Sequence, residues 1–233
     1  MSVPPAAPRP AWLLPLAAAL ATPDRVEQVV ALRPGAGGRA AAVLCLIGDG
    51  PDGPEVLFVE RAATLRTHPG QIAFPGGAAD PGDADLVDTA LREAEEEVGV
   101  QRSGVDVLGL LPPAHVAVSG FDVTAVVGWW RDRSQLGAAD AREVASAPVV
   151  PVSVLTDPDR RASVRHPSGY TGPAFEVPGH LIWGLTAHLL DGVLELAGWQ
   201  RPWDRRRRVA IPARYLIDRS DHTRPDLGGS DAH

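Results

Sequence analysis

The stretch from Asp85 to Val98 is the feature that most limits what this chain can fold into. Its apolar residues recur at spacings of three and four, at Val87, Leu91, Ala94 and Val98. This periodicity predicts a helix that anchors one face on a core. Either Asp85 or Asp88 is placed to cap the beginning of the helix, and Gly99 follows where a helix-ending glycine belongs.

Apolar runs of strand length lie on both sides of this helix. The expected strands are Ala40–Ile47, Val56–Val59, Val105–Leu111, Val123–Trp130 and Val149–Val154, with a short extended segment at Gln71–Phe74. The turn 48–53 is rich in Gly, Asp and Pro, which indicates a hairpin between the first two strands. We also expect a helical region from Ala11 to about Val30 and a later helix from about His180 to Leu194. Strands on both sides of one central helix indicate an α/β or α+β sandwich.

The chain divides into three parts. Residues 1–37 form an N-terminal arm with a short helix and a Gly-rich linker, residues 38–195 the main domain, and residues 196–233 a C-terminal extension that we expect to be partly disordered. A chain of 233 residues is long enough for one domain with a substantial core.

Charge and cysteine usage exclude several classes of protein. The net charge of -7 argues against a protein that wraps around a polyanion, so we expect no nucleic-acid partner. Cys45 is the single cysteine, which rules out an intrachain disulfide and a cysteine-based zinc site, and a buried thiol in a reducing cytoplasm fits it. The run Ala11–Ala21 loosely resembles a signal peptide, but Pro15 interrupts it and it is too short to span a bilayer. We therefore expect a packed N-terminal helix and no membrane partner.

Three glutamates in the central helix carry the chemistry. Each helical residue advances about 100°, so Glu93, Glu96 and Glu97 project from one face, whereas Glu95 falls on the other side. Carboxylates at these spacings repel each other, and a hard divalent cation such as Mg²⁺ or Mn²⁺ reverses that repulsion. A solvated acidic face is the alternative interpretation. Arg92 precedes the cluster, and its planar guanidinium could hold one of the carboxylates in position.

A glycine elbow leads into this helix. Phe74-Pro75-Gly76-Gly77 breaks the chain sharply, and glycines there let the backbone approach a ligand closely. The whole segment resembles the Nudix hydrolase signature, whose second half matches Arg92–Val100 at every specified position. With the usual spacing, the first Gly and the acid of that signature would fall on Ala78 and Ala84. One inserted residue places them on Gly77 and Asp83, which leaves the role of Asp83 open.

A second motif narrows the resemblance. Arg61–Gly77 is similar to the segment that marks the coenzyme A pyrophosphatase branch, in which the Nudix box carries the same one-residue insertion. Ile182–Ala187 is similar to the last helix of that branch, so the resemblance covers about residues 38–195. It implies an α/β/α sandwich with a mixed β-sheet, and hydrolysis of coenzyme A or its derivatives to 4′-phosphopantetheine and adenosine 3′,5′-bisphosphate.

The resemblance also implies roles for the acidic residues. Glu93 and Glu97 would ligate Mg²⁺ or Mn²⁺, with Glu96 as a further ligand and a backbone carbonyl near Gly76 or Gly77 completing the shell. Glu96 and Glu93 are the leading candidates for the base that activates water, with Arg92 as the residue that holds them. Glu143 stands where many Nudix proteins carry a further acid, and it is either a metal ligand, a base or a solvated loop residue.

Substrate contacts are expected just before the elbow. Arg61 and Arg66 suit the pyrophosphate and the 3′-phosphate of coenzyme A, and His68 is either a further contact or a surface residue. The run Arg205–Arg208, between Trp203 and the end of the chain, could bind RNA or a nucleotide. Trp199 and Trp203 flank the run, but a solvated patch that faces the acidic body, or a contact in a homodimer, is the preferred interpretation of it.

Two alternative functions remain. The same chemistry could act on ADP-ribose, a dinucleotide or a damaged nucleoside triphosphate, because fold does not fix substrate. The domain could also be a non-catalytic ligand sensor, although a sensor has little reason to keep all three glutamates.

Overall fold

The computed structural model describes residues 8–30, 34–117, 119–133, 136 and 142–216. Its α-helices are α1 (Leu14–Leu20), α2 (Pro23–Val29), α3 (Leu86–Val98), α4 (Val152–Leu155) and α5 (Gly184–Leu196). Short 3₁₀ turns are η1 (Ala11–Leu13), η2 (Arg102–Gly104), η3 (Pro158–Arg160) and η4 (Ala213–Tyr215). None of the helices in these ranges is both long and apolar enough to cross a bilayer.

The strands form one large sheet and two small ones. The strands before the central helix are β1 (Arg39–Gly50), β2 (Gly53–Leu57), β3 (Val59–Arg61), β4 (Ile72–Ala73) and β5 (Gly76–Ala78). Those after it are β6 (Val105–Leu110), β7 (Ala114–Val116), β8 (Phe121–Trp130), β9 (Val144–Ser146), β10 (Val149–Pro151), β11 (Arg161–Arg165), β12 (Thr171–Val177) and β13 (His180–Ile182).

The large sheet is mixed. Its strand order is β10-β2-β1-β8-β6, with β5 paired to β1 and β7 paired to β8. The central pair β1 and β8 runs parallel, and the other pairs are antiparallel. The expected hairpin is confirmed, because β1 and β2 pair through Gly50 and Gly53.

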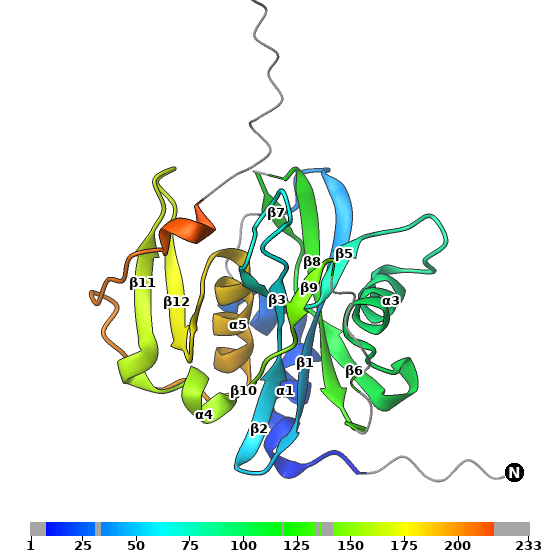
Figure 1. Ribbon diagram of the computed structural model, residues 1–233. Coiled ribbons are helices and arrows are strands. Elements are labelled where there is room, and N and C mark those ends of the chain that lie inside the picture. Colours follow the sequence, from blue (N-terminus) through cyan, green and yellow to red (C-terminus); the bar gives the residue numbers. More distant parts are fainter. Residues whose placement is uncertain (1–7, 31–33, 118, 134–135, 137–141, 217–233) are drawn as a thin grey trace, which may run out of the picture.

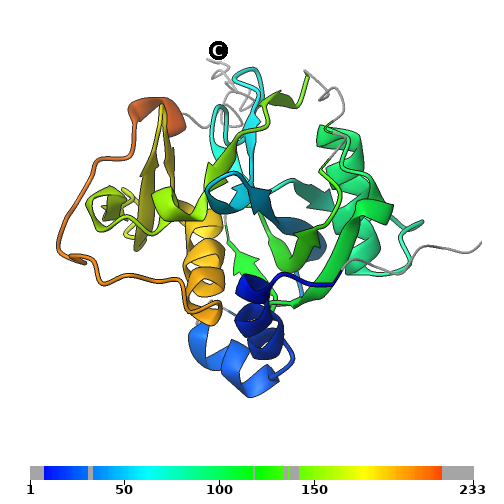
Figure 2. The same ribbon diagram turned by 90° about the horizontal axis from the view of Figure 1, so that it is seen from below.

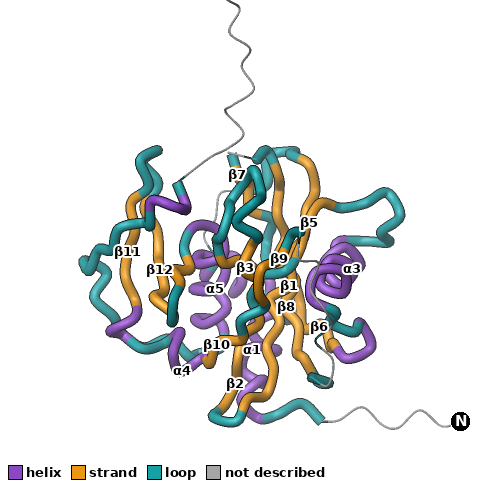
Figure 3. The backbone as a smooth tube through the Cα atoms, viewed as in Figure 1, coloured by secondary structure: helices purple, strands orange, loops and turns teal. Residues whose placement is uncertain are grey.

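Helices cover both faces of this sheet, as the α/β/α expectation requires. Helix α3 lies on one face, and α1, α2 and α5 lie on the other (Figures 1 and 2). Figure 3 shows the same layers, with the strands in orange between the purple helices. The alternation along β1 explains both contacts, because successive side chains of a strand point to opposite faces. Leu44 and Leu46 pack with α3, whereas Cys45 and Ile47 pack with α5.

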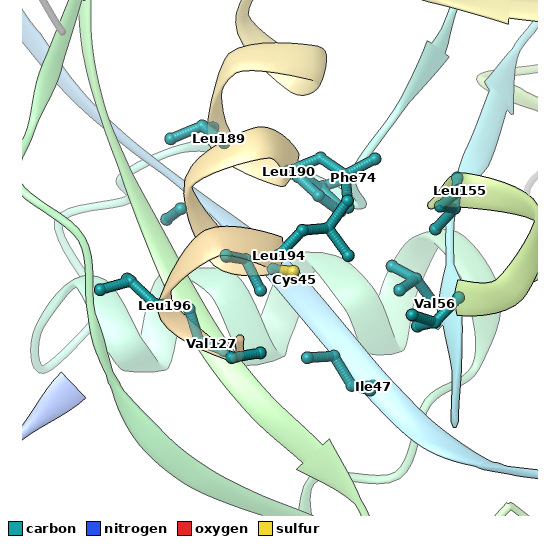
Figure 4. Packing of buried hydrophobic residues seen from close by; sticks show 14 of the residues in the cluster. Cys45, Ile47, Val56, Phe74, Val127, Leu155, Leu189, Leu190, Leu194 and Leu196 are labelled. Atoms are coloured by element: carbon teal, nitrogen blue, oxygen red, sulfur yellow. The ribbon is translucent and has the colours of Figure 1, made fainter. Parts of the chain in front are cut away.

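The core between the sheet and α5 is built mainly from aliphatic side chains, together with the aromatic rings of Phe58, Phe74 and Trp129. Figure 4 shows Leu190 and Leu194 of α5 close to Cys45 and Ile47 of β1. The thiol of Cys45 is fully buried, as expected, and burial raises its pKa far above the usual range.

The N-terminal helices belong to this core. Leu13, Leu16 and Leu20 are buried in the same cluster as α5, which confirms the packed N-terminal helix. Pro15 does not break α1, because it lies in the first turn, where a backbone N–H has no helical partner. Pro23 begins α2 in the same way, so the expected helical region is two short helices.

Two predicted boundaries were wrong. The stretch from His180 does not begin a helix, because His180–Ile182 pairs with β12 across a turn at Gly179 and α5 begins only at Gly184. The strand expected at Val149–Val154 ends at Pro151, after which α4 begins. Proline has no N–H to extend a β-ladder and its fixed φ suits the residue before a helix.

Candidate active site

At the glycine elbow, the backbone of β5 lies very close to that of its partner strand β1. Gly76 has φ of +153° and pairs with Val43, and a Cβ at Gly76 would lie 2.6 Å from the Val43 Cα and collide with the Ala42 carbonyl. A Cβ at Gly77 would lie 2.5 Å from Oε1 of Glu93. At Gly76 only glycine fits, because the contacts are with the backbone of β1; at Gly77 a larger residue would displace the Glu93 carboxylate.

Glu97 is the buried member of the glutamate cluster. The residue is 5% exposed, and its Oε2 accepts a hydrogen bond of 3.0 Å from the Gly76 N–H. The pKa of Glu97 is raised to about 7, and burial is the main cause. The charges of Glu93 and Glu143 also raise it, whereas the hydrogen bond from the Gly76 N–H and the charge of Arg61 lower it. This carboxylate is therefore the most destabilised charge in the cluster.

Glu93 and Glu96 lie progressively further out. The side chain of Glu93 is 17% exposed and that of Glu96 60% exposed. Burial raises the pKa of Glu93, and the Arg92 guanidinium opposes that rise. Arg92 links Glu93 with Glu96, and the charge of Glu93 acts on Glu97. The helical spacing gave no difference in burial among the three glutamates.

Arg92 connects the helix to the loop before it. Its Nε and Nη2 donate to the two carboxylate oxygens of Asp83 at 2.8 and 3.0 Å, a two-pronged pair. Its Nη1 donates to Oε1 of Glu93 and to Oε2 of Glu96, both at 3.0 Å. One side chain thus holds Asp83 and orients two of the three glutamates, where the sequence suggested one.

Asp83 supports Arg92 in this arrangement. Its side chain is 5% exposed and accepts hydrogen bonds from the Thr89 hydroxyl at 2.8 Å and the Asp80 N–H at 2.9 Å. The Arg92 guanidinium holds the pKa of Asp83 well below its usual range, with the Asp80 N–H acting in the same direction. The role that the sequence left open for Asp83 is therefore that of an anchor for Arg92. Thr89 was missed, because its hydroxyl bond depends on the fold of the loop.

The donor set fits a hard divalent cation, although its side chains are not gathered around one. Within the described residues, no three His, Cys, Asp or Glu side chains converge closely enough to enclose a metal ion. Hydrogen bonds hold the carboxylates apart: Arg92 donates to Glu93 and Glu96, whereas Glu97 accepts from the Gly76 N–H. Clustered carboxylate oxygens whose pKa values rise through burial and mutual repulsion are nevertheless the ligands that Mg²⁺ and Mn²⁺ prefer.

Arg61 and Glu143 come close to the cluster from β3 and the loop before β9. The Ala62 N–H donates to the Glu143 carbonyl at 2.8 Å, and Arg61 and Glu143 both shift the pKa of Glu97. Nε of Arg61 is buried and has no hydrogen-bond partner within the described residues. Arg61 therefore carries an unpaired N–H donor that is buried beside the cluster.

Arg66 and His68 lie on the loop between β3 and β4. Both residues are exposed, and His68 has a left-handed backbone with φ of +54°. Arg66 makes no hydrogen bond or ion pair with the residues that the structure describes.

The arginine run lies elsewhere. Arg207 donates to the Arg161 carbonyl at 3.2 Å, and Arg205 lies 5.3 Å from the Trp203 ring centroid. The segment that carries them runs beside β11, on the other side of α5 from α3 (Figure 1). The structure therefore does not bring Arg205–Arg208 together with the glutamate cluster.

Comparison with known proteins gives consistent matches. The model of the NUDIX domain family matches residues 38–167. A relative from Cronobacter sakazakii, named Uncharacterized Nudix hydrolase NudL, is 56% identical over 90 residues, which are 39% of this chain and 46% of the relative. The chain thus spans about half the length of that relative.

Two further matches cover more of the chain. A relative of the same name from Photorhabdus laumondii is 42% identical over 160 residues, covering 65% of this chain and 81% of the relative. Among solved structures, a MutT/nudix family protein from Enterococcus faecalis is 16% identical over 70% of this chain and 63% of its own, with a TM-score of 0.47.

Proposed function

The chain belongs to the Nudix family, and from that premise we propose that it hydrolyses a phosphoanhydride bond in a nucleoside diphosphate derivative with the help of a divalent metal ion. The observation that carries the proposal is the pair Glu93 and Glu97, two carboxylates whose pKa values are raised beside the glycine elbow. Burying ionisable groups in this way costs stability, and such groups cluster at functional sites.

Glu93, Glu96 and Glu97 would hold the metal ion, Mg²⁺ or Mn²⁺. When bound there, such an ion would supply neutralisation of phosphate charge and activation of water. The residues of the chain supply the positioning: the Gly76 N–H fixes Glu97, and Arg92 orients Glu93 and Glu96. Glu93, Glu96 and Glu143 are the candidates for the base that takes the proton of the attacking water.

Arg61 and Arg66 are proposed to bind the substrate phosphates. The Nε–H of Arg61 has no partner among the described residues, although it is buried, so a substrate oxygen would reach it only after a local side-chain shift. Arg66 has an exposed guanidinium on the adjoining loop. We place His68 beside them on the same loop as a further contact. The motif Arg61–Gly77 favours coenzyme A or its derivatives as the substrate, with cleavage to 4′-phosphopantetheine and adenosine 3′,5′-bisphosphate. The proposed compartment is the cytoplasm, where Cys45 stays reduced.

A turnover panel tests the substrate. Purified protein is incubated with coenzyme A, ADP-ribose, a diadenosine polyphosphate and an oxidised nucleoside triphosphate, each with Mg²⁺ and with Mn²⁺. We expect the highest kcat/KM for coenzyme A, and mass analysis in H₂¹⁸O should show one labelled phosphate among the two products. Faster hydrolysis of ADP-ribose than of coenzyme A would reject the coenzyme A assignment and keep the chemistry.

A matched pair of variants separates the enzyme from a ligand sensor. Glu97→Gln should abolish turnover, because it removes a charge from the cluster, whereas Glu95→Gln should retain it. Glu95 is on the same helix, but its exposed side chain pairs with Arg102. If Glu97→Gln hydrolyses the substrate as fast as the unaltered protein, the catalytic proposal fails.

A further inference from the structure

The C-terminal segment Arg205–Leu216, here called the C-terminal strap, lies beyond the matched family region but packs on the domain. The Ser163 N–H donates to the Arg207 carbonyl at 2.8 Å, and the Val209 N–H donates to the Ser163 carbonyl at 3.1 Å. The strap thus continues the edge of the sheet at β11, with Ser163 and Arg208 as bridge partners.

Two apolar side chains anchor the end of the strap. Ile211 is 8% exposed and Tyr215 4% exposed. Both belong to a cluster with Val164 and Leu181, which come from β11 and β13. Burial of this extent stabilises a packed segment, so the strap has a defined position on the domain.

Tyr215 reaches from this cluster to the loop that precedes the glycine elbow. The side-chain amide of Gln71 donates to the Tyr215 carbonyl at 3.0 Å. A Cβ at Gly70 would lie 3.8 Å from Cε1 of Tyr215, so the ring lies against that glycine. Gly70 has φ of +67°, which lets the chain turn at this contact.

The contact lies at the base of residues 62–70, here called the substrate loop, where the two ends of the loop meet. The Gly70 N–H donates to the Arg61 carbonyl at 3.0 Å, and the Arg61 N–H donates to the Gln71 carbonyl at 2.9 Å, so the loop leaves and rejoins the sheet at one point. Arg66 and His68 project from it with exposed side chains. A contact that fixes the base of the loop therefore limits the directions in which Arg66 and His68 point.

We propose that Tyr215 and Gln71 are positioning residues of the substrate site, through which the C-terminal strap holds the loop 62–70 ready to bind the phosphate-bearing part of the substrate. This inference rests on the proposed function, because it assumes that Arg66 or His68 contacts a nucleotide. Preorganising a binding loop strengthens ground-state binding by lowering the ordering cost, so the effect falls on KM more than on kcat.

Two variants test the proposal. Gln71→Ala should raise KM for coenzyme A about fivefold, the change that corresponds to one net hydrogen bond. Tyr215→Ala should raise KM about tenfold, because it removes the ring that lies against Gly70 and also makes the backbone carbonyl that accepts from Gln71 less firmly held. In both variants kcat should stay within about twofold of the unaltered value, since neither residue touches the glutamates. Hydrogen exchange of the peptide covering 62–71 should become faster in both.

Trp12→Ala is the matched control for a general loss of stability. Trp12 packs on Trp199 and donates to Asp49 at 2.9 Å. The dark-blue segment that carries it lies at the bottom of Figure 1, away from the red segment that includes η4 at the upper left. This variant should lower Tm without changing KM or the exchange of residues 62–71.

The outcomes separate this inference from the proposed function. Unchanged exchange of residues 62–71 in Tyr215→Ala, or a KM that rises no more than in Trp12→Ala, would overturn the positioning role. If the unaltered protein hydrolyses none of the substrates in the panel, the proposed function fails. In that case, the affinity for adenosine 3′,5′-bisphosphate, measured by calorimetry, is compared in place of KM. Equal affinity in Gln71→Ala, Tyr215→Ala and Trp12→Ala would then overturn the positioning role as well.

Discussion

Replacing Glu97 with glutamine should stabilise the metal-free protein at pH 8. Glu97 is 5% exposed as a residue and has Glu93 nearby, so its charged form is disfavoured in the folded state. Glutamine is neutral and nearly the same size, and its carbonyl oxygen can accept the same hydrogen bond from the Gly76 N–H. The substitution therefore removes the destabilising charge and leaves the local packing in place.

The size and pH dependence of this effect follow from the pKa of Glu97. A rise from the ordinary 4.5 to about 7 corresponds to about 3 kcal/mol between the protonation states. Because the pKa is raised in the folded state, the contribution of this group to stability is fully present below pH 4.5 and is lost as the pH rises through about 7. Glu97→Gln should thus match the unaltered protein near pH 4.5 and exceed it by up to about 3 kcal/mol above pH 7. For a chain of this length, that difference is about 6 to 12 °C in Tm.

Urea unfolding in EDTA at pH 5, 6, 7 and 8 measures the effect directly. The difference between Glu97→Gln and the unaltered protein should grow with pH, and Glu95→Gln should show no such growth because Glu95 is exposed. Adding Mn²⁺ should raise the stability of the unaltered protein more than that of Glu97→Gln. A Glu97→Gln protein that is less stable than the unaltered one at pH 8 in EDTA, or a difference that is independent of pH, would refute this reasoning.

Three further changes have expected outcomes. Gly77→Ala should weaken Mn²⁺ binding about tenfold in a calorimetric titration, because the new Cβ would displace the Glu93 carboxylate, and undiminished affinity would contradict the close approach. Arg92→Lys should lower kcat/KM by about 10- to 100-fold, because lysine cannot form the two-pronged pair with Asp83, and unaltered kinetics would show that this pair is dispensable. Cys45 should not react with a disulfide reagent in the native protein and should react fully in denaturant, since burial raises its pKa, so a rapid native reaction would contradict its burial.

The central helix could be predicted from the sequence because its signals are local. Asp85 accepts a hydrogen bond of 2.8 Å from the Asp88 N–H, and Gly99 ends the helix with φ of +70°, both as the sequence indicates. The apolar spacing also placed Ala94 and Val98 in the core, where both are buried. Cap, periodicity and terminating glycine all lie within one stretch of chain, so no distant contact was needed to find them.

The depth of each glutamate could not be predicted in this way. The helical spacing gives a direction for each side chain, but the burial of Glu97 and the exposure of Glu96 depend on how α3 lies against β1 and β5. That packing is set by strand pairing between residues more than thirty positions apart, such as Val43 and Gly76. The assignment of Asp83 to Arg92 likewise depends on the fold of the loop and not on sequence spacing.

The small outer sheet was missed for a related reason. Strands β11 and β12 are short and carry polar residues such as Arg161, Ser163 and Thr171, so they lack the apolar run that identified β1. Side chains that are distant in the sequence stabilise these strands through contacts with Arg161 of β11. Arg161 pairs with Asp191 of α5 and lies between the rings of Phe175 and Trp203.

Crystals soaked in Mn²⁺ and measured at the manganese absorption edge would test the metal site most directly. We expect an anomalous peak about 2 Å from carboxylate oxygens of both Glu93 and Glu97, beside the glycine elbow. A protein that hydrolyses its substrate in Mn²⁺ while the only strong peak lies away from these two side chains would contradict it.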